Sequence, residues 1–225
     1  MAQARQGRNW FAIWISVAVV VVLVGVGVLV VWMNNLANAP APRPESSGIN
    51  EETGAVVVGT GAGQVDVFFD FYCPHCQEFE DYYGPTIADL IESDDITLNL
   101  HPVALQNLNA ASGTDFSERS ANAMYCVAEA EPEAAFPFFQ SLFALHPSGS
   151  GQTDAELASL ASEAGAPDIS ACLEDRTWEK LVAEQTREIP ANPETGGAGT
   201  PTLLVNGEYV LLTGDPQADI VDRLG

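Results

Sequence analysis

One long apolar run stands near the start of the chain. From Phe11 to Met33 the sequence carries no charged side chain. At about 1.5 Å per residue, a helix of this length reaches about 35 Å, enough to cross a hydrocarbon core of about 30 Å. The pattern predicts a transmembrane helix over residues 11–33. The alternative is a signal peptide cleaved after Ala37-Asn38-Ala39, but such peptides have an apolar region of only about 7–15 residues, and we expect Pro40 to hinder cleavage.

The residues that flank this run indicate its orientation. Arg5 and Arg8 precede it with no acid nearby, whereas three acids accompany the arginine on the far side (Arg43 with Glu45, Glu51 and Glu52). Basic residues favour the cytoplasmic side, so residues 1–10 are expected in the cytoplasm and the rest of the chain outside. Tryptophans near both ends of the run fit interfacial anchors (Trp10, Trp14 and Trp32). The sequence therefore predicts a single-pass protein of the cell membrane.

The remaining sequence predicts a linker and one α/β domain. Residues 34–53 are rich in Pro, Ala, Ser and Glu without an apolar period, which indicates a flexible linker. Residues 54–225 have the length of one domain. The apolar periods predict strands at 55–58 and 65–71, a helix from Pro74 with a kink at Gly84-Pro85, a strand at 96–100, a helical block at 116–189, strands at 202–205 and 209–212 joined by an Asn206-Gly207 turn, and a helix from about Pro216.

The charge balance excludes some classes of partner. After residue 33 the chain has six basic residues against all 31 acidic ones. Such a surface repels phosphate backbones, so no nucleic-acid partner is expected, and the carboxylates are interpreted as a solvated surface. The glycine-rich turn at residues 59–63 is not followed by the Gly-Lys-Ser/Thr of a phosphate-binding loop. No flavin, nicotinamide or other cofactor site is expected.

Two cysteines lie three positions apart where a strand gives way to a helix. Cys73 is placed at the N-cap, and Pro74 suits the first helical position because its missing N–H would have no partner there. The free amides and the helix dipole should lower the pKa of the Cys73 thiol. Cys76, one turn on, can attack a mixed disulfide on Cys73, so the pair can cycle between dithiol and disulfide. A static disulfide is one alternative. Half of a zinc site is the other, although the sequence lacks two further ligands at recognisable spacing.

The two remaining cysteines, Cys126 and Cys172, both fall in the helical block. In an oxidising compartment, an even number of cysteines outside the active-site pair favours a structural disulfide over two buried free thiols. His101 and His146 stand alone in the sequence and are expected on the surface or in the core rather than as ligands. No metal site is predicted.

The sequence resembles the thioredoxin-fold superfamily, and within it the DsbA-like thiol:disulfide oxidoreductases. The resemblance covers about residues 54–225 and rests on the stretches 68–76 (Phe-Phe-Asp-Phe-Tyr-Cys-Pro-His-Cys) and 199–202 (Gly-Thr-Pro-Thr). Pro-His between the cysteines is the dipeptide of the oxidising members, which points to Pro74 and His75 as part of the active site. The second stretch resembles the cis-proline loop, in which Pro201 lies beside the disulfide and Thr200 offers backbone groups to a substrate strand.

This resemblance implies a thioredoxin-like fold with an inserted helical domain, here at about 116–189. The membrane-anchored arrangement resembles that of Gram-positive bacteria, actinobacteria in particular. Two positions depart from the family pattern. The buried acid that often lies six residues before the first cysteine is replaced by Val67, with Asp70 as a partial substitute. Thr200 before the cis-proline also occurs in isomerases and Gram-positive relatives.

The resemblance implies an extracytoplasmic enzyme that donates its Cys73–Cys76 disulfide to exported proteins with free thiols. Turnover implies a quinone-linked membrane reoxidant of the DsbB or vitamin K epoxide reductase type. A reductase or isomerase of the same fold is the first alternative. The second is a Cu(I)-binding chaperone or binding module with Cys73 and Cys76 as soft ligands, against which the lack of a Cys-x₃-Cys plus distant His pattern counts.

Overall fold

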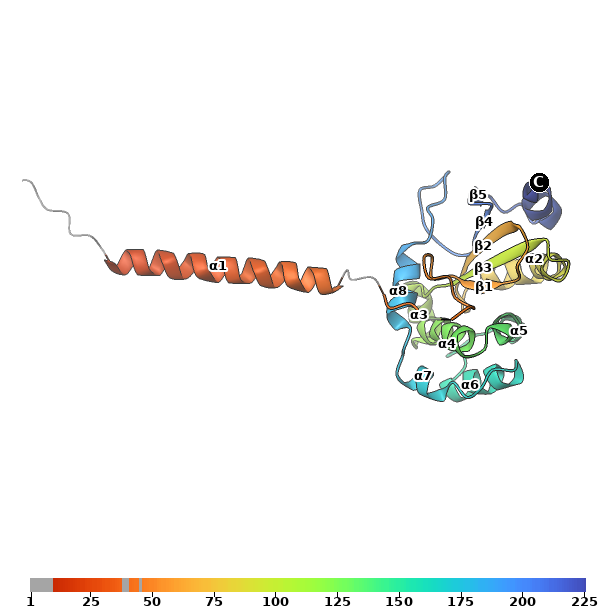
Figure 1. Cartoon of the computed structure of the whole chain (residues 1–225), viewed down its shortest axis with the longest axis horizontal. Coiled ribbons are helices and arrows are strands. Elements are labelled where there is room, and N and C mark those ends of the chain that lie inside the picture. Colours follow the sequence, from red (N-terminus) through yellow and green to blue (C-terminus); the bar gives the residue numbers. More distant parts are fainter. Residues whose placement is uncertain (1–9, 38–40, 45) are drawn as a thin grey trace, which may run out of the picture. The chain divides into compact units, whose positions relative to one another are not determined.

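One long helix, α1 (Trp10–Ala37), makes up the described part of the first of two structural units, residues 1–40. The computed structural model describes residues 10–37, 41–44 and 46–225 (Figure 1). Within α1 the stretch Ile13–Asn35 is long and apolar enough to span a membrane. The helix extends beyond the predicted span, residues 11–33. Of the expected cytoplasmic segment, residues 1–9 lie outside the described residues.

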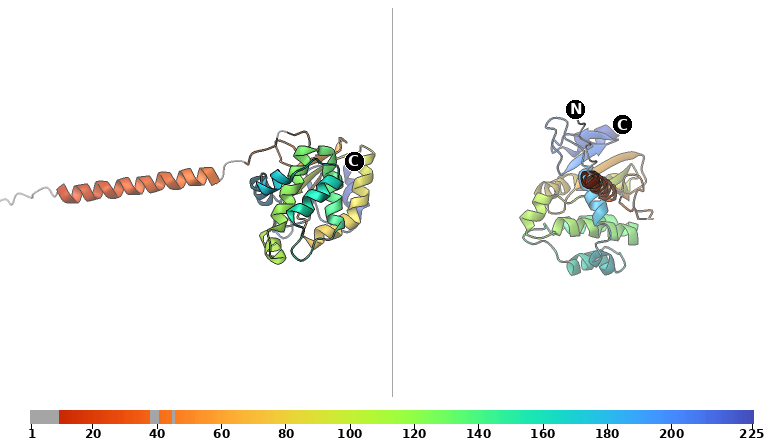
Figure 2. Two further views of the ribbon diagram at one scale, coloured as in Figure 1. Left: turned by 90° about the horizontal axis from the view of Figure 1, so that it is seen from below. Right: turned by 90° about the vertical axis from the view of Figure 1, so that its left-hand side faces the viewer.

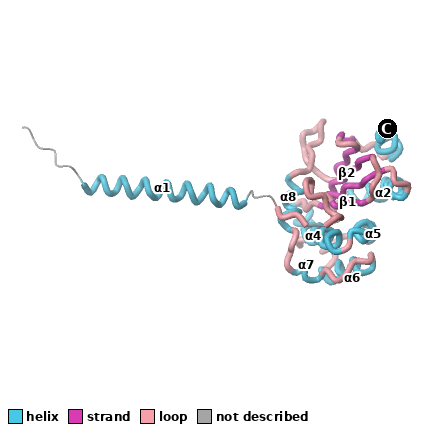
Figure 3. Tube along the Cα trace, viewed as in Figure 1, coloured by secondary structure: helices cyan, strands magenta, loops and turns pink. Residues whose placement is uncertain are grey.

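The second unit, residues 41–225, alternates strands and helices in the predicted order. A helical block between the third and fourth strands interrupts a sheet of five strands (Figure 3, magenta). The elements are β1 (Val56–Val58), β2 (Gly63–Phe69), α2 (Pro74–Glu92), β3 (Ile96–Pro102), α3 (Gln106–Ser112), α4 (Phe116–Ala130), α5 (Pro132–Ala144), α6 (Asp154–Glu163), α7 (Ser170–Glu174), α8 (Glu179–Arg187), β4 (Thr202–Val205), β5 (Glu208–Val210), the π-helical turn η1 (Gln217–Val221) and α9 (Asp222–Leu224).

The sheet has the strand order β1-β3-β2-β4-β5. Strands β2 and β3 are parallel, and the other neighbours are antiparallel. Because β2 lies at the centre, it is apolar on both faces near its end, where Val67, Phe68 and Phe69 are all buried. A strand that ends inside the core delivers the residues after it to a covered part of the molecule.

The helical block lies against the sheet as a separate layer. In Figure 1, α3, α4 and α5 lie below the sheet, and α6 and α7 lie beyond them. The end-on view in Figure 2 shows the same layering, with the green and teal helices on the side opposite the blue C-terminal strands. Aromatic side chains join the layers, since Phe69 and Phe71 pack against Phe139 and Phe143 of α5 at centroid distances of 4.9–6.1 Å. The end of β2 is thereby fixed to the block.

The segment expected to be a linker, residues 34–53, is in part folded onto the second unit. The backbone N–H of Ala41 donates to Glu184 Oε2 at 2.7 Å, and Arg43 pairs with Glu184 Oε1. The hydroxyl of Ser46 donates to the Ala128 carbonyl at 3.0 Å, and Ile49 is buried. This differs from the prediction because partners on α4 and α8, far along the chain, hold a segment that has no periodicity of its own.

Several other boundaries differ from the prediction: the strands expected at 96–100 and 209–212, for example, are Ile96–Pro102 and Glu208–Val210. The helical block begins at Gln106 rather than 116, because the short helix α3 precedes α4 and ends at Gly113 in the left-handed conformation (φ 68°). Strand β2 ends at Phe69 rather than 71, since the side chain of Asp70 binds the backbone N–H groups of Tyr72 and Leu105 and turns the chain out of the sheet. The closing helix begins as the π-helical turn η1. The Asn206-Gly207 turn is present, with both residues at positive φ.

Candidate active site

Cys73 lies four residues beyond the end of β2, at the N-cap of α2. Its backbone is extended (φ −80°, ψ 117°), and Pro74 occupies the first turn of the helix. The carbonyl of Cys73 accepts from the N–H groups of Cys76 and Gln77 at 3.0 and 3.1 Å. The first N–H groups of a helix have no partner within it. The sulfur of Cys73 is therefore held beside the first N–H groups of the helix, and those of Cys76 and His75 stabilise a negative charge on it.

The two thiols are unlinked, and both are buried. Only 6% of Cys73 is accessible, against 1% of Cys76. The cover comes from the loop before β4, where the Thr200–Pro201 peptide bond is cis. The Cys73 thiol donates to the Thr200 carbonyl over 3.5 Å. The structure thus brings Thr200 next to Cys73, and Cys73 remains the more accessible of the two sulfurs.

The pKa values of the two thiols are shifted in opposite directions. A hydrogen bond from Cys76 is the largest cause that lowers the pKa of Cys73, to about 5. Burial opposes this shift, whereas the Thr200 side chain and the backbone N–H groups of Cys76 and His75 add to it. Burial, together with the neighbouring Cys73, raises the pKa of Cys76 well above its ordinary value. At neutral pH the pair therefore carries one thiolate, on Cys73, and one thiol, on Cys76.

The His75 side chain lies on the surface, with 76% of it exposed. Its Nδ1 is 3.1 Å from Glu78 Oε2, and this contact is the largest cause of its raised pKa, followed by the charge of Cys73. Any influence of the imidazole on Cys73 thus acts across solvent, while the His75 backbone N–H acts directly. A screened charge is worth much less than a buried one. The side chain should contribute less to the Cys73 pKa than the amides do.

Asp70 is a fully buried acid in the turn before Cys73. Its two carboxylate oxygens accept from the N–H groups of Tyr72 (2.9 Å) and Leu105 (2.8 Å). Burial nevertheless raises its pKa to about 6. The carboxylate ties the active-site turn to the chain after β3, a role that the sequence did not reveal because Leu105 is 35 residues away. At the position of the family acid, Val67 is buried in the sheet.

Two cavities lie at the start of α2, one lined in part by His75 and Thr200 and the other by Cys73. One, of about 350 Å³, is mainly apolar, and its lining includes Phe79, Tyr82, Tyr83, Pro201 and Leu212. The other, of about 360 Å³, is more polar, and its lining includes Tyr72, Cys73, Gln77, Glu78, Asp81 and His146. The hydroxyl of Tyr72 donates to the Gly149 carbonyl at 2.7 Å, which holds the loop after α5 in place as the wall of the second cavity. Cys73 and Pro201 were predicted from the sequence, whereas His146 and Leu212 were not, because they come from distant segments.

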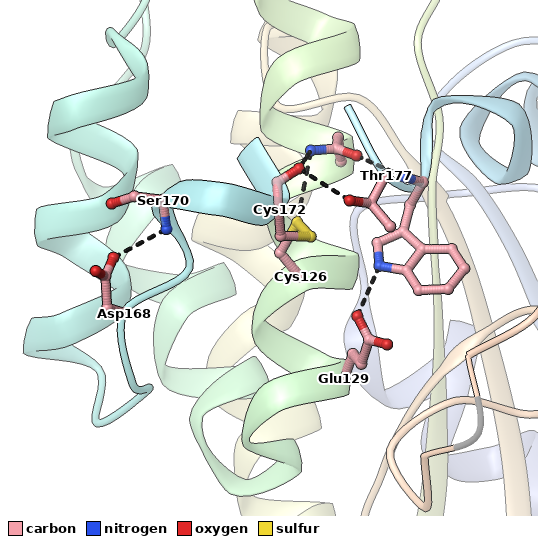
Figure 4. Close-up of a disulfide and its surroundings, with 8 residues drawn as sticks. Cys126, Glu129, Asp168, Ser170, Cys172 and Thr177 are labelled. Atoms are coloured by element: carbon pink, nitrogen blue, oxygen red, sulfur yellow. Dashed lines mark hydrogen bonds between the residues drawn. A yellow bond between two sulfur atoms is a disulfide. The ribbon is translucent and has the colours of Figure 1, made fainter. Parts of the chain in front are cut away.

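Cys126 and Cys172 form a disulfide that joins α4 to α7 (Figure 4). Their Cα atoms are 6.0 Å apart. The side chain of Asn122 lies over the bridge: its Nδ2 donates to the Cys172 carbonyl at 3.4 Å, and its Oδ1 accepts from the Trp178 backbone N–H at 2.8 Å. The bridge is thus part of the packing between helices and lies apart from Cys73 and Cys76 in the fold.

The two isolated histidines take different places. His101 is buried, stacks on Phe68 at 4.0 Å and contacts Gln185 Oε1 (2.7 Å) and Asp66 Oδ1 (3.1 Å), so it belongs to the core. His146 follows α5 and lines the polar cavity beside Cys73. Across residues 10–37, 41–44 and 46–225, no group of three or more His, Cys, Asp or Glu side chains is placed to hold a metal ion.

Comparisons with known proteins agree with this geometry. The sequence model of a family described as Thioredoxin matches residues 52–221. No curated protein matches the chain. Among solved structures, oxidised DsbA of Mycobacterium tuberculosis is 29% identical, with a TM-score of 0.61 over 73% of this chain and 88% of that one. The reduced disulfide bond oxidoreductase DsbG of the same organism is also 29% identical, with a TM-score of 0.60 over 77% and 80%.

A third solved structure extends the likeness in fold. MdbA, a thiol-disulfide oxidoreductase from Corynebacterium diphtheriae, is 19% identical, with a TM-score of 0.64 over 85% of this chain and 100% of that one. At this identity the likeness concerns the fold alone. The family match, by contrast, spans the cysteine pair, the helical block and the cis-proline loop together. The chain belongs to the thioredoxin family and is a DsbA-like disulfide oxidoreductase.

Proposed function

We propose that the enzyme works as an oxidase outside the cytoplasm, and that it donates a Cys73–Cys76 disulfide to exported proteins with free thiols. The observation that carries this proposal is the opposite shift of the two pKa values, with Cys73 at about 5 and Cys76 well above its ordinary value. Stabilising the Cys73 thiolate stabilises the reduced enzyme. A stable reduced form makes the oxidised form a strong oxidant.

The reaction transfers two electrons from the substrate to the enzyme; of the two protons that the substrate thiols lose, Cys76 takes up one and the solvent takes up the other, because Cys73 ends as a thiolate. A substrate thiolate attacks Cys73 Sγ, the Cys73–Cys76 bond breaks, and Cys76 leaves as a thiolate that takes up a proton. A second substrate thiolate then attacks the substrate sulfur of the mixed disulfide. The Cys73 thiolate departs, and the substrate disulfide is complete. A low pKa favours Cys73 as this final leaving group.

The loop around the cis peptide bond supports the roles of Thr200 and Pro201 in substrate binding. The Thr200 carbonyl, 3.5 Å from Cys73 Sγ, is at the place where the backbone of a bound strand would need a partner. We propose that an extended substrate segment pairs with this loop. His75 and Pro74 then act at the start of α2, the first through its amide and charge and the second by shaping the first turn.

For the location, we propose a cytoplasmic segment over residues 1–10, a membrane span that includes 11–33, and a catalytic domain outside the cell membrane. The span is supported by the apolar stretch of α1. The orientation rests on Arg5 and Arg8 before that stretch. The Cys126–Cys172 disulfide also suits an oxidising compartment.

Each turnover leaves Cys73 and Cys76 reduced, so the cycle requires a reoxidant. We propose a quinone-linked membrane protein of the DsbB or vitamin K epoxide reductase type, which the membrane anchor would bring within reach. The alternatives are a reductase or isomerase of the same fold and, with less support, a Cu(I)-binding chaperone. A Cu(I) chaperone would retain metal stoichiometrically and would not oxidise thiols.

A test of the oxidase function is the oxidation of a reduced dithiol peptide by the full chain in nonionic detergent. The oxidised enzyme should form one peptide disulfide per Cys73–Cys76 pair, and many when a chemical oxidant regenerates it. A Cys73→Ser/Cys76→Ser variant, which keeps Cys126 and Cys172, is the matched control and should form none. Equal peptide oxidation by the enzyme and this control would refute the proposal.

A further inference from the structure

Asp219 is a buried acid that the chemistry of the two cysteines does not use. It lies on η1, and only 1% of it is accessible. Its Oδ2 accepts from the Tyr83 hydroxyl at 2.5 Å and from the Thr213 backbone N–H at 2.7 Å, and its Oδ1 accepts from the Thr213 hydroxyl at 2.9 Å. Burial acts to raise the pKa of Asp219, but these hydrogen bonds outweigh it and hold the pKa below its ordinary value. At neutral pH the side chain is therefore a carboxylate with three donors.

The Tyr83 hydroxyl is the second member of this network. While it donates to Asp219, it accepts from the Gly214 backbone N–H at 2.8 Å. Gly214 has φ 84°, a conformation that glycine adopts without strain. We call residues 211–215 the Leu212 loop, which follows β5 and leads towards η1. Asp219 of η1 and Tyr83 of α2 thus hold the backbone of the Leu212 loop at two successive residues.

The Leu212 loop forms part of the wall of the apolar cavity. This cavity of about 350 Å³ is lined by residues of α2, of the cis-proline loop and of the Leu212 loop, among them Phe79, Tyr82, Tyr83, Pro201, Leu212 and Gly214. The Tyr83 ring stacks on that of Phe79 at a centroid distance of 4.6 Å. Tyr82 and Leu212 are 68% and 38% exposed, so apolar side chains are open to solvent here. A substrate segment on the cis-proline loop would have side chains beside this cavity.

We infer that Asp219 is a positioning residue for substrate binding: with Tyr83, it fixes the Leu212 loop so that the cavity receives an apolar side chain close to the reacting cysteine of the substrate. The inference rests on the proposed function, because it requires a substrate segment on the cis-proline loop. The physical reason is preorganisation. A loop that is already ordered loses little conformational entropy when a ligand packs against it, so the ligand binds more tightly. Without the network, binding would first have to order the loop.

The test uses a dithiol peptide with serine at every position around the first cysteine, and a set in which one of these serines is replaced by leucine. The full chain is reconstituted in lipid nanodiscs, so that no free detergent competes for the apolar cavity. Oxidation of the peptides, with a chemical oxidant regenerating the enzyme and the rate without enzyme subtracted, gives kcat and KM. For the best-placed leucine, KM should be about tenfold lower than for the all-serine peptide, since withdrawing about half of a leucine side chain from water is worth about that factor.

Two variants disturb the network in different ways. Asp219→Asn turns one acceptor oxygen into a donor group, which cannot accept from the N–H or hydroxyl that it faces. Tyr83→Phe removes the hydroxyl but keeps the ring that stacks on Phe79. Each variant should raise KM for the leucine peptide about fivefold with kcat unchanged, the pattern of a binding interaction that is equal in the ground and transition states. The double variant should lose no more than either single one, because both residues act through one network.

Asp222→Asn is the matched control. Asp222 lies on α9, is exposed, and accepts from the side chain of Gln217 rather than from the Leu212 loop. The variant removes one charge from the same end of the chain and should leave KM as in the wild-type enzyme. Urea unfolding of every variant records the change in stability separately from the change in KM. Should Asp219→Asn fail to fold, Tyr83→Phe, which keeps the carboxylate, decides alone.

If the variants are less stable but keep the wild-type KM for the leucine peptide, the inference is overturned, because the network then stabilises only the end of the chain. Equal KM values for the leucine and serine peptides in the wild-type enzyme would overturn it as well. In both cases the peptides are still oxidised, so the proposed function stands. Failure of the enzyme to oxidise any of the peptides would overturn the proposed function, and the inference with it.

Discussion

The two cysteine pairs of the chain differ in what surrounds their sulfur atoms. Cys73 lies at an N-cap, where a hydrogen bond from the Cys76 thiol, helped by the backbone N–H groups of Cys76 and His75, lowers its pKa to about 5. Cys126 lies inside α4 and is bonded to Cys172, 46 residues along the chain, beneath the side chain of Asn122. Both pairs are mostly buried. The comparison teaches that local amides and an accessible edge, rather than burial alone, distinguish a reactive pair from a structural one.

The largest effect should separate the two thiols of the reactive pair. In cells that express Cys76→Ala, mixed disulfides with exported proteins should accumulate on Cys73, because no resolving thiol remains. Cys73→Ala should trap almost none, since Cys76 is 1% exposed and its pKa is raised. Non-reducing gels of the trapped protein give the measurement. Equal trapping by both variants would show that the assignment of nucleophile and resolving thiol is wrong.

The structural pair should affect stability and not redox chemistry. Removal of the bridge in Cys126→Ala/Cys172→Ala should lower the free energy of unfolding by about 4 kcal/mol in the chain-entropy model, less any strain. Urea unfolding of the full chain in detergent measures it. The Cys73 pKa should stay as in the wild-type protein, because the bridge contacts neither active-site sulfur. A shifted Cys73 pKa in the folded variant would break the comparison.

Asp70 should make stability depend on pH. Its folded pKa, about 6, lies above the ordinary value of 3.8, so the folded state binds the proton more tightly than the unfolded state. The protonated carboxyl therefore adds up to about 3 kcal/mol to the free energy of unfolding. This contribution is complete below about pH 3.8 and is lost as the pH rises to about 6. Asp70→Asn should remove this slope between pH 4 and 6. If the free energy of unfolding depends on pH in the same way in the variant and the wild-type protein, the pKa of Asp70 is not raised.

A smaller effect is expected from His75. The imidazole is exposed and paired with Glu78, so His75→Ser should raise the Cys73 pKa by less than one unit. The couple should become more reducing by less than about 30 mV, the equivalent of about 1.4 kcal/mol for two electrons. Thiolate absorbance against pH, measured on the same sample as the potential, tests both values. A large change in either would mean that the side chain, rather than the helix amides, controls Cys73.

Local sequence was sufficient to predict much of the fold. Strand β4, the Asn206-Gly207 turn and the helix from Pro74 were predicted correctly because their apolar period and turn residues are contained within a few positions. The cysteine pair of the active site was also recognisable, since its spacing and its Pro-His dipeptide are local. The membrane-spanning length of α1 follows from composition in the same way.

The parts that sequence did not reveal depend on distant contacts. Only the family resemblance placed Thr200, 127 residues away, near Cys73, and nothing in the sequence indicated that Asp70 binds the backbone of Leu105. The docked segment after Pro40 depends on Glu184, more than 140 residues along the chain. The hydrophobic periodicity of the sequence does not indicate contacts between residues so far apart.

The central claim, that the environment of Cys73 makes this pair an oxidant, is tested most directly by its redox equilibrium with glutathione. Oxidised and reduced fractions of the Cys73–Cys76 pair are measured by alkylation and mass spectrometry across a series of glutathione ratios, with the Cys126–Cys172 peptide as an internal reference. The account predicts a potential closer to the value of about −120 mV for DsbA than to that of about −270 mV for thioredoxin. A potential at or below the thioredoxin value would contradict it and would identify the enzyme as a reductase.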